Sequence, residues 1–301
     1  MSKTIEIVEV GPRDGLQNED TIISTDDKVA FIRRAISAGV KRIEIASFVH
    51  PKRVPQMADA EDVVSLLGPI KDVTRVGLTL NKRGAFRALE CGIDELGAVC
   101  VASDGFGLAN QNATSEQTVE TANEIVKLAK SEGRSAQVTI STAFGCPFDG
   151  EISEERVLEI VSKLLDSAPR EIALADTIGV AVPSQVYSLV RKVVELTGDI
   201  PVRVHFHNTR NTAIANVWAA IESGASVIDG SIGGIGGCPF APNATGNVAT
   251  EDVVYMLQRS GVGHGLSIDG LIETAKWLET ILDKKVPSML AAAGGFPVNQ
   301  S

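Results

Sequence analysis

Residues 201–232 of the chain read PVRVHFHNTRNTAIANVWAAIESGASVIDGSI. An apolar, β-branched run at Val202–His207 is followed by an amphipathic stretch at Thr212–Ser223 and a second apolar run at Ser226–Ile232. Gly224 stands just past the amphipathic stretch, where the C-terminus of a helix favours a residue that tolerates positive φ. This order predicts a strand, a helix and a second strand, as in the βα units of parallel sheets.

The same alternation extends along the chain, with a spacing of about 30 residues between strand candidates. Eight such units in about 260 residues fit a closed barrel. An open doubly wound sheet is the alternative, but the first strand runs into Gly11-Pro12-Arg13-Asp14-Gly15 and not into the phosphate fingerprint GxGxxG. We therefore expect an α/β fold, a (β/α)8 TIM barrel with extra C-terminal helices. The expected strands are Thr4–Val10, Arg42–Ser47, Thr74–Leu80, Leu96–Ala102, Ala136–Thr142, Glu171–Asp176, Val202–His207 and Ser226–Ile232.

The domain organisation follows from the absence of any linker or low-complexity segment. We expect residues 1–301 to form one catalytic barrel domain, with residues 262–301 as a C-terminal extension packed on the barrel. Within that extension, Ser267–Asp283 has the pattern of additional helices, and the tail from Ala291 is rich in Gly and Pro.

The composition narrows the class of protein. Of 301 residues, 44% are hydrophobic and 22% charged, which is ordinary for a globular protein. A net charge of −10 argues against nucleic acid or an anionic membrane as partner, so an anionic ligand would need a local positive site. The four cysteines show no CxxC pairing, no apolar stretch reaches membrane-spanning length, and Met1-Ser2-Lys3-Thr4 shows no targeting signal. We expect a cytoplasmic protein.

The most informative residues are His205 and His207. In a strand, residues i and i+2 point to the same side, so both imidazoles would project from one face. Imidazole is the commonest side-chain metal ligand. Two hydrogen-bonded core histidines are an equally good interpretation of the spacing alone, so the neighbouring strand ends must decide.

Ligand-type residues end several of the other strands, at the rim where barrel active sites are built. Individually each has a structural explanation: Asp14 could cap a turn, Asp176 could cap a helix, and Glu44 could be half of an ion pair. Jointly they favour a metal site with Asp14 as carboxylate ligand and Asn247 as a further oxygen, suited to Mg²⁺ or Mn²⁺. The strand-end residues are Arg13, Asp14, Gln17, Glu44, Ser47, Asn81, Asp176, His205 and His207.

The loop after the eighth strand reads Gly233-Gly234-Ile235-Gly236-Gly237-Cys238-Pro239. Its glycines suit a segment that closes over a site. Cys238 alone is best explained as a small buried hydrophobe. Beside a metal and an arginine, however, a positive field would favour its thiolate and make proton transfer feasible.

These motifs resemble the 3-hydroxy-3-methylglutaryl-CoA lyase family of metal-dependent TIM-barrel acyl-CoA lyases. The resemblance covers residues 5–260 and rests on Val8–Glu19, Ser47-Phe48-Val49 with Val54–Met57, Gly145–Phe148, Ala175–Gly179, His205-x-His207, and Gly236–Pro239 with Gly246–Asp252. It implies a retro-Claisen cleavage that gives acetyl-CoA and a keto acid, an acyl-CoA substrate, a homodimer and a place in leucine catabolism.

The resemblance also implies roles for single residues. Asp14, His205, His207 and Asn247 would hold a divalent cation, Mg²⁺ or Mn²⁺. Arg13 would stabilise the developing enolate oxyanion, with Glu44 orienting it. Asp176 or His205 would take the hydroxyl proton, and Cys238 would protonate the enolate carbon. Residues expected to bind substrate are Arg13, Gln17, Ser47, Asn81 and Arg210.

Two departures from the family pattern bear on the acyl group. Where the lyases carry Asp-Thr-Tyr-Gly after the second histidine, this chain has Asn208-Thr209-Arg210-Asn211. The segment 103–112 also lacks the lysines expected before its asparagine. Tolerated drift would explain both. Alternatively, Arg210 pairs with the distal carboxylate of a related acid such as citramalyl-CoA, which would yield pyruvate in place of acetoacetate.

Two rival functions are open. A Claisen-type synthase would run the reverse condensation, but such relatives usually add a C-terminal regulatory domain for which 301 residues leave no room. A barrel that has lost catalysis would show decay at the site, whereas every residue assigned a role here is present.

Overall fold

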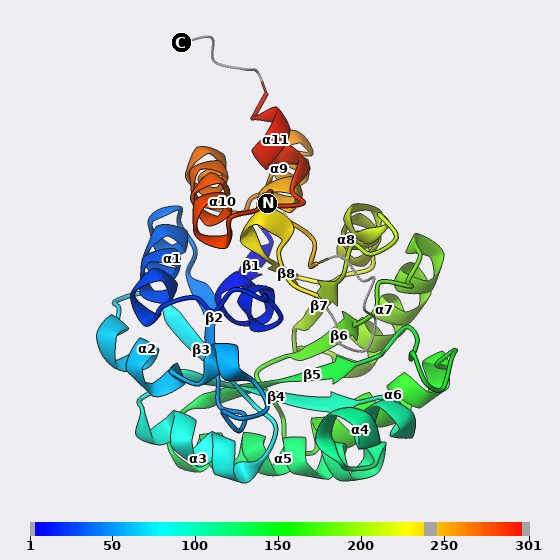
Figure 1. Ribbon diagram of the computed structural model, residues 1–301. Helices are drawn as coiled ribbons and strands as arrows, with labels where there is room; N and C mark the ends of the chain where they lie inside the picture. Colours follow the sequence, from blue (N-terminus) through cyan, green and yellow to red (C-terminus); the bar gives the residue numbers. More distant parts are fainter. Residues whose placement is uncertain (1–3, 238–245, 297–301) are drawn as a thin grey trace.

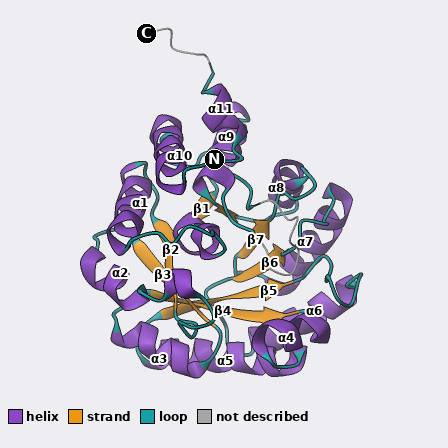
Figure 2. Ribbon diagram, viewed as in Figure 1, coloured by secondary structure: helices purple, strands orange, loops and turns teal. Residues whose placement is uncertain are grey.

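The computed structural model describes residues 4–237 and 246–296, and its centre is a closed barrel of parallel strands (Figures 1 and 2). The strands follow one another around the barrel in chain order, and β8 closes against β1 with Glu6 paired to Val227. The expected TIM barrel is confirmed. The strands are β1 (Glu6–Glu9), β2 (Arg42–Ser47), β3 (Thr74–Thr79), β4 (Glu95–Val101), β5 (Ser135–Ser141), β6 (Ile172–Asp176), β7 (Val202–Phe206) and β8 (Val227–Gly230).

Helices alternate with the strands and form the outer layer (Figure 2). Polar N-caps begin several of them; α5, for example, starts with a capping box in which Thr114 and Gln117 satisfy each other's backbone amides. The helices of the eight units are α1 (Thr25–Ser37), α2 (Ala60–Leu67), α3 (Lys82–Glu90), α4 (Asp104–Gln111), α5 (Ser115–Ser131), α6 (Glu154–Leu165), α7 (Pro183–Thr197), α8 (Ala213–Glu222) and α9 (Thr250–Arg259).

The C-terminal segment packs beside α1 and α9 at one side of the barrel (Figure 1). The stretch expected to hold extra helices is one helix, α10 (Ile268–Leu282), and a short α11 (Met289–Ala293) follows. Trp277 of α10 packs against Phe31 of α1, with ring centroids 6.3 Å apart. No helix in residues 4–237 or 246–296 is long and apolar enough to cross a membrane.

Side chains alternate between the two faces of each strand, which places polar groups inside the barrel. In β7, Val204 and Phe206 face the apolar layer between the strands and the helices, whereas Arg203 and His205 line the central cavity. In β5, Val138 likewise lies in the apolar layer. The hydrophobic core therefore surrounds the barrel and separates it from the helices.

The interior of the barrel near the amino-terminal ends of the strands holds a chain of buried ion pairs. Most such barrels carry branched apolar side chains in their interior. Arg42 pairs with Glu95 and with Glu171, the latter at 2.7 Å. Glu171 also lies 2.8 Å from the Nε of Arg203, and Arg203 Nη1 contacts Asp229 at 2.7 Å. All five side chains are almost fully buried, so each charge depends on its partners. The chain of ion pairs connects the floor of the barrel to the residues at its carboxyl end.

Candidate metal centre and active site

Arg13 and Asp14 lie in a π-helical turn, η1 (Gly11–Gly15), directly after β1. The backbone amides of residues 13, 14 and 15 all donate to the carbonyl of Val10. Single π-turns of this kind occur frequently at functional sites. Gly15 permits the turn to approach its neighbours, since a Cβ there would come within 2.8 Å of Ile235 and Ser231 side chains.

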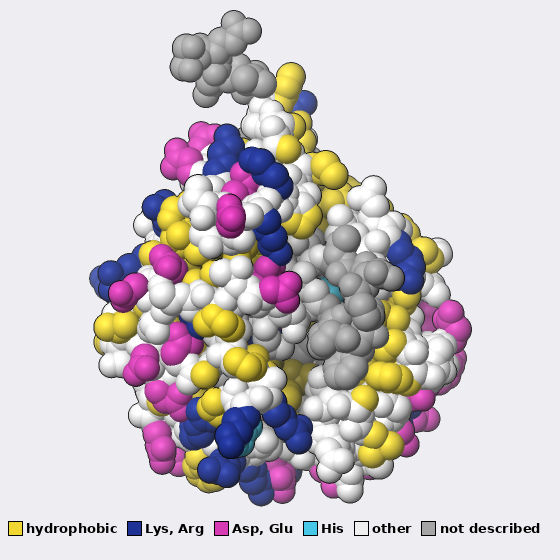
Figure 3. Space-filling view, viewed as in Figure 1, with side chains coloured by type: hydrophobic (Ala, Val, Ile, Leu, Met, Phe, Trp, Pro, Cys, Tyr) yellow, Lys and Arg dark blue, Asp and Glu magenta, His cyan; other side chains and the backbone are white. Residues whose placement is uncertain are grey.

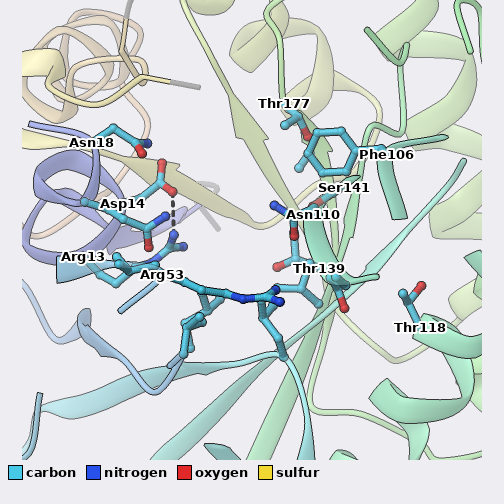
Figure 4. Close-up of a pocket in the computed structure, with 18 of the residues that line it drawn as sticks. Arg13, Asp14, Asn18, Arg53, Phe106, Asn110, Thr118, Thr139, Ser141 and Thr177 are labelled. Carbon is cyan, nitrogen blue, oxygen red and sulfur yellow. Dashed lines mark hydrogen bonds and ion pairs between the residues drawn. The ribbon is translucent and has the colours of Figure 1, made fainter. Parts of the chain in front are cut away.

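Arg13 bridges two carboxylates. Its Nε donates to Glu44 Oε2 at 2.6 Å, and its Nη1 donates to Asp14 Oδ1 at 2.6 Å (Figure 4). Burial raises the pKa of Glu44, an effect that the nearby guanidinium only partly offsets. For Asp14, burial would also raise the pKa, but Arg13 and the two histidines hold it well below its usual range. Asp14 is therefore an anion, and Arg13 is fixed between two acceptors.

Asp14, His205 and His207 form a compact cluster of ligand atoms, all within 4.8 Å of one another. His205 Nε2 lies 3.8 Å from Asp14 Oδ2, and His207 Nε2 lies 3.7 Å from the same oxygen. Two atoms bound to one ion at about 2.1 Å each can be at most about 4.2 Å apart, so these separations suit a shared cation. These distances favour the interpretation of His205 and His207 as possible metal ligands over that of two hydrogen-bonded core histidines.

Asp229 at the end of β8 supports His205 from the other side of its ring. The Nδ1 of His205 lies 3.0 Å from Asp229 Oδ2, which leaves Nε2 facing Asp14. A carboxylate behind a ligating histidine is a recurrent feature of metal sites, because it fixes the ring and its tautomer. Burial would lower the pKa of His205, but the hydrogen bond to Asp229 and the charge of Asp14 raise it.

Asn247 tests whether the cluster fits a cation. Its Nδ2 donates to Asp14 Oδ2 at 2.9 Å and to the carbonyl of Ile235 at 3.2 Å. Its amide oxygen is buried and has no hydrogen-bond donor among the described residues. A buried acceptor without a donor normally costs free energy, and the amide, turned over so that its oxygen and not its nitrogen faces Asp14, would direct this oxygen to a cation beside the carboxylate. The donor set of one carboxylate, one amide oxygen and two imidazoles fits Mg²⁺ or Mn²⁺.

A cavity of about 860 Å³ opens above the cluster and extends towards α4 and α5 (Figure 4). Gln17 and Asn81, both expected to bind substrate, line it together with Arg13. The opposite wall is made of short polar side chains that are not among the expected site residues: Asn110, Thr139, Ser141 and Thr177. A period-2 polar pattern in Gln137, Thr139 and Ser141 was the signal that could have found the β5 members.

Positive side chains gather at the mouth of the cavity, on the face shown in Figure 3. We call His50, Lys52, Arg53, Lys82 and Arg83 the basic rim; His50 and Arg53 line the cavity, and the other three are exposed. Lys82 pairs with Glu124 at 2.9 Å, whereas Lys52, Arg53 and Arg83 have no carboxylate partner among the described residues. Lys82 and Arg83 occupy the first turn of α3, where positive charge is unfavourable unless an anion is nearby.

Two expected site residues lie outside the cavity wall. The Asp176 carboxylate accepts the backbone amides of Val180 and Ala181 at 2.9 and 3.0 Å, so it organises the loop before α7. Burial raises the pKa of Asp176, and these two hydrogen bonds partly offset the rise. Ser47 is buried at the end of β2, 1% exposed, and its hydroxyl has no partner among the described residues. Neither residue is placed to touch a ligand in the cavity.

Arg210 is also directed away from the cavity. Its Nη1 donates to the carbonyls of Ile178 and Gly179, at 3.1 and 2.8 Å, which ties the loop after β7 to the loop after β6. The geometry therefore gives no support to pairing between Arg210 and a substrate carboxylate. Cys238 lies outside the described residues, so the structure places the other residues of the expected site without it.

A (β/α)8 barrel with an Asp-His-His cluster and a paired arginine at the carboxyl ends of its strands has a possible metal site on the rim where TIM-barrel enzymes build their active sites. Residues 4–278 match the HMGL-like family model, and the chain belongs to the HMGL-like family. With its relatives, this makes the protein a carbon–carbon lyase of the oxo-acid-lyase kind.

Relatives are similar over nearly their whole length. An (R)-citramalyl-CoA lyase of Chloroflexus aurantiacus is 41% identical, covering 97% of this chain and 95% of the relative. A hydroxymethylglutaryl-CoA lyase of Bacillus subtilis is 39% identical, covering 95% and 96%. The structure of an HMG-CoA lyase from Acinetobacter baumannii, in complex with coenzyme A and 3-methylmalate, superposes with a TM-score of 0.94 at 41% identity, covering 99% and 97%.

Proposed function

We propose that the protein cleaves 3-hydroxy-3-methylglutaryl-CoA, or a close 3-hydroxyacyl-CoA, into acetyl-CoA and acetoacetate with the help of Mg²⁺ or Mn²⁺. The observation that carries the proposal is the contact between Arg13 and Asp14: a fixed guanidinium touches the carboxylate of the possible metal site at 2.6 Å. A retro-Claisen cleavage needs both a group that acidifies a hydroxyl and a cation beside the developing enolate.

The residues that would hold the cation are Asp14, His205 and His207, with the amide oxygen of Asn247. When bound, the cation would lower the pKa of the substrate's tertiary hydroxyl group and orient the acid portion. Asp229 keeps the His205 ring in place, while Arg13, itself held by Glu44, would face the thioester oxygen.

The proton and electron balance of the reaction is simple. The hydroxyl proton leaves, the carbon–carbon bond breaks as the carbonyl of the keto acid forms, and the electron pair passes to the thioester as an enolate. Of the two bases proposed from the sequence, Asp176 lies outside the cavity wall, and His205 directs Nδ1 to Asp229 and Nε2 towards the cation, so neither would be free to take the proton while the cation is bound. The hydroxyl proton would then pass to solvent in the cavity. Arg13 would stabilise the enolate oxygen, and Cys238 would return a proton to its carbon.

The basic rim supports a CoA ester in particular. The chain carries a net charge of −10, so three exposed cations without a carboxylate partner among the described residues, Lys52, Arg53 and Arg83, are a local exception. Coenzyme A is a polyanion at its nucleotide end. We propose that its phosphate groups lie against Lys52, Arg53 and Arg83, while the acyl group reaches the metal centre.

A second substrate has a specific observation in its favour. The 41% identical relative from Chloroflexus aurantiacus is a citramalyl-CoA lyase, and citramalyl-CoA is one methylene shorter at its acid end. Cleavage of that ester would give acetyl-CoA and pyruvate. Because Arg210 faces carbonyl groups, the short polar side chains Thr139, Ser141 and Thr177 are better candidates to distinguish the two acids.

A panel of 3-hydroxyacyl-CoA esters tests the proposal, with Mg²⁺ and with EDTA, and with acetoacetate and pyruvate measured separately. Acetoacetate from hydroxymethylglutaryl-CoA supports the first substrate, and pyruvate from citramalyl-CoA alone supports the second. No cleavage of either ester, or full activity in EDTA, would contradict the proposed reaction. The synthase alternative predicts condensation of acetyl-CoA with a 2-oxo acid in the same assay.

The organisation of the protein in the cell completes the proposal. We propose one catalytic domain over residues 1–301, a homodimer in the cytoplasm and a role in leucine catabolism. Light scattering of the purified protein measures the mass of the assembly, and a monomer mass at micromolar concentration would contradict the dimer.

A further inference from the structure

Arg203 lies on β7, two residues before His205, and so projects from the same face of the strand into the barrel. It is 3% exposed and belongs to the chain of ion pairs. Its partner Asp229 also contacts His205 of the possible metal site. An arginine in this position has two possible functions: it could bind the acid end of a substrate, or it could hold other residues in place.

The contacts of Arg203 distinguish these functions. Its Nη1 donates to Asp229 Oδ1 at 2.7 Å and Oδ2 at 2.8 Å, and its Nη2 donates to Thr139 Oγ1 at 3.0 Å and to Gln137. Its Nε lies 2.8 Å from Glu171 Oε1 in an ion pair. Nη1 and Nη2 already donate to acceptors within the barrel, and Nε is buried beside Glu171 without a hydrogen bond among the described residues, so no nitrogen of the guanidinium is accessible to a substrate.

Asp229 connects Arg203 to His205. One of its oxygens, Oδ2, contacts both Arg203 Nη1, at 2.8 Å, and His205 Nδ1, at 3.0 Å. The guanidinium therefore determines how the carboxylate is turned, and the carboxylate determines how the imidazole is turned. His205 Nε2 is left 3.8 Å from Asp14 Oδ2, within the cluster of possible ligand atoms.

We propose that Arg203 is a positioning residue for the metal centre: by fixing Asp229 it holds His205 in the orientation and tautomer that directs Nε2 towards the cation. The inference rests on the proposed metal site and deepens it. Arg203 contacts both oxygens of Asp229 through Nη1 alone, while Nη2 on Thr139 and Nε beside Glu171 fix the plane of the guanidinium. An ammonium group is a single nitrogen and cannot make these separated contacts together. Arg203→Lys keeps the buried charge and removes this fixed geometry.

The test measures Mn²⁺ affinity directly, by electron paramagnetic resonance of free Mn²⁺ or by calorimetry, on the full chain. Arg42→Lys is the matched control, because Arg42 is equally buried, pairs with the same Glu171, and does not contact Asp229. Loss of a residue that supports a ligand typically weakens metal binding by 10- to 100-fold. We expect roughly a tenfold loss or more in Arg203→Lys and less than a twofold change in Arg42→Lys.

Thermal unfolding in EDTA separates this effect from stability, and we expect both lysine variants to lose stability. Unchanged Mn²⁺ affinity in Arg203→Lys, or equal losses in the two variants, would overturn the positioning role. If the wild-type protein binds no Mn²⁺, the metal centre itself is contradicted, which is a different result from wild-type binding that Arg203→Lys leaves unchanged.

A second measurement needs no variant and is independent of folding yield. In ¹⁵N-histidine NMR of the metal-free wild-type protein, the neutral His205 ring should carry its proton on Nδ1, where Asp229 accepts it. A neutral ring protonated on Nε2 would overturn the proposal, because Asp229 would then not set the tautomer.

Discussion

Arg13 and Glu44 are 31 residues apart in the chain, yet Arg13 Nε lies 2.6 Å from Glu44 Oε2, across the turn after β1 and the interior of β2. The carboxylate takes up one edge of the guanidinium and leaves Nη1 directed at Asp14. Glu44 therefore fixes the orientation of Arg13, and its proposed role is to hold the arginine and not to take part in the reaction itself.

Replacement of this arginine should abolish most of the activity and leave the fold intact. We expect Arg13→Lys to lower kcat by roughly 100- to 1000-fold, the usual cost of removing one oxyanion donor. Glu44→Gln should lower kcat less, because it loosens Arg13 without removing it. Steady-state kinetics and circular dichroism check both variants, and a wild-type rate in Arg13→Lys would contradict the mechanism.

Cys238 offers a test of the proton return to the enolate. Cys238→Ser should lower kcat by about 100-fold or more, in the range found for positioned acids, and leave Mn²⁺ affinity unchanged. Cys91→Ser is the control, since Cys91 lies after α3, outside the residues that line the cavity. Equal rates in the two variants would remove Cys238 from the reaction.

The structure predicts a different consequence for Asp176 than a catalytic role would. Asp176→Asn leaves one oxygen where two backbone amides are now satisfied, so a buried amide loses its acceptor at a cost of about 1–3 kcal/mol. We expect stability and activity to fall together, as the loop from residue 178 to 181 shifts. A loss of kcat at unchanged unfolding temperature would instead restore Asp176 to the proton transfer expected from the sequence.

The basic rim should affect binding of the CoA ester and not the chemical step. We expect Arg53→Ala with Arg83→Ala to raise KM for the CoA ester roughly three- to tenfold, since each exposed ion pair contributes up to about 1 kcal/mol. The KM for the matching pantetheine thioester, which lacks the nucleotide, should not change.

The control for the basic rim carries the same charge change at the opposite end of the barrel. Lys41 and Lys71 are exposed and precede β2 and β3, so they lie at the amino-terminal ends of the strands. Lys41→Ala with Lys71→Ala should leave KM for the CoA ester unaltered. A similar rise in both double variants would show a long-range effect of net charge and no phosphate contact.

The burial of Glu9 predicts that the free energy of unfolding depends on pH in an unusual way. Burial raises the pKa of Glu9 to about 8, although its oxygens accept hydrogen bonds from Gly11, Ile232 and Thr250. The folded protein keeps the proton up to about pH 8, whereas the unfolded chain releases it near the ordinary value of 4.5. This contribution to stability is therefore complete at low pH and is lost as the pH rises towards 8.

Urea unfolding at pH 5.5 and pH 8 in EDTA measures the effect. Glu9→Gln mimics the neutral side chain, so its free energy of unfolding should fall less between the two pH values than that of the wild type. Part of the dependence should persist, because burial also raises the pKa of Glu251 to about 7. Glu222→Gln, at an exposed site, is the control and should behave as the wild type does.

Much of the fold could be predicted from local sequence, because each βα unit carries its own periodicity. β2 begins and ends at the expected residues, and Gly224 takes positive φ after α8, as its place in the sequence predicts. The His205-x-His207 spacing and Asp14 predicted the cluster, since a barrel brings strand ends to one rim. The extra helices expected at the C-terminus are confirmed as α10 and the short α11.

What sequence could not supply was the direction of individual polar side chains. Arg210 and Asp176 follow the right strands, but their side chains satisfy backbone groups of neighbouring loops. Arg203 and Asp229 were missed for the opposite reason. They sit within apolar runs as isolated charges, and their pairing across 26 residues exists only once β7 and β8 are adjacent.

The charged interior of the barrel has a consequence for how reliably the chain folds. A slip of one residue in the pairing of β7 would turn Arg203 and His205 outwards, into the apolar layer under the helices. An uncompensated guanidinium there costs far more free energy than a misplaced valine, so a barrel with β7 out of register is strongly disfavoured. The side chains that support the proposed metal centre thereby also help to set the register of the barrel.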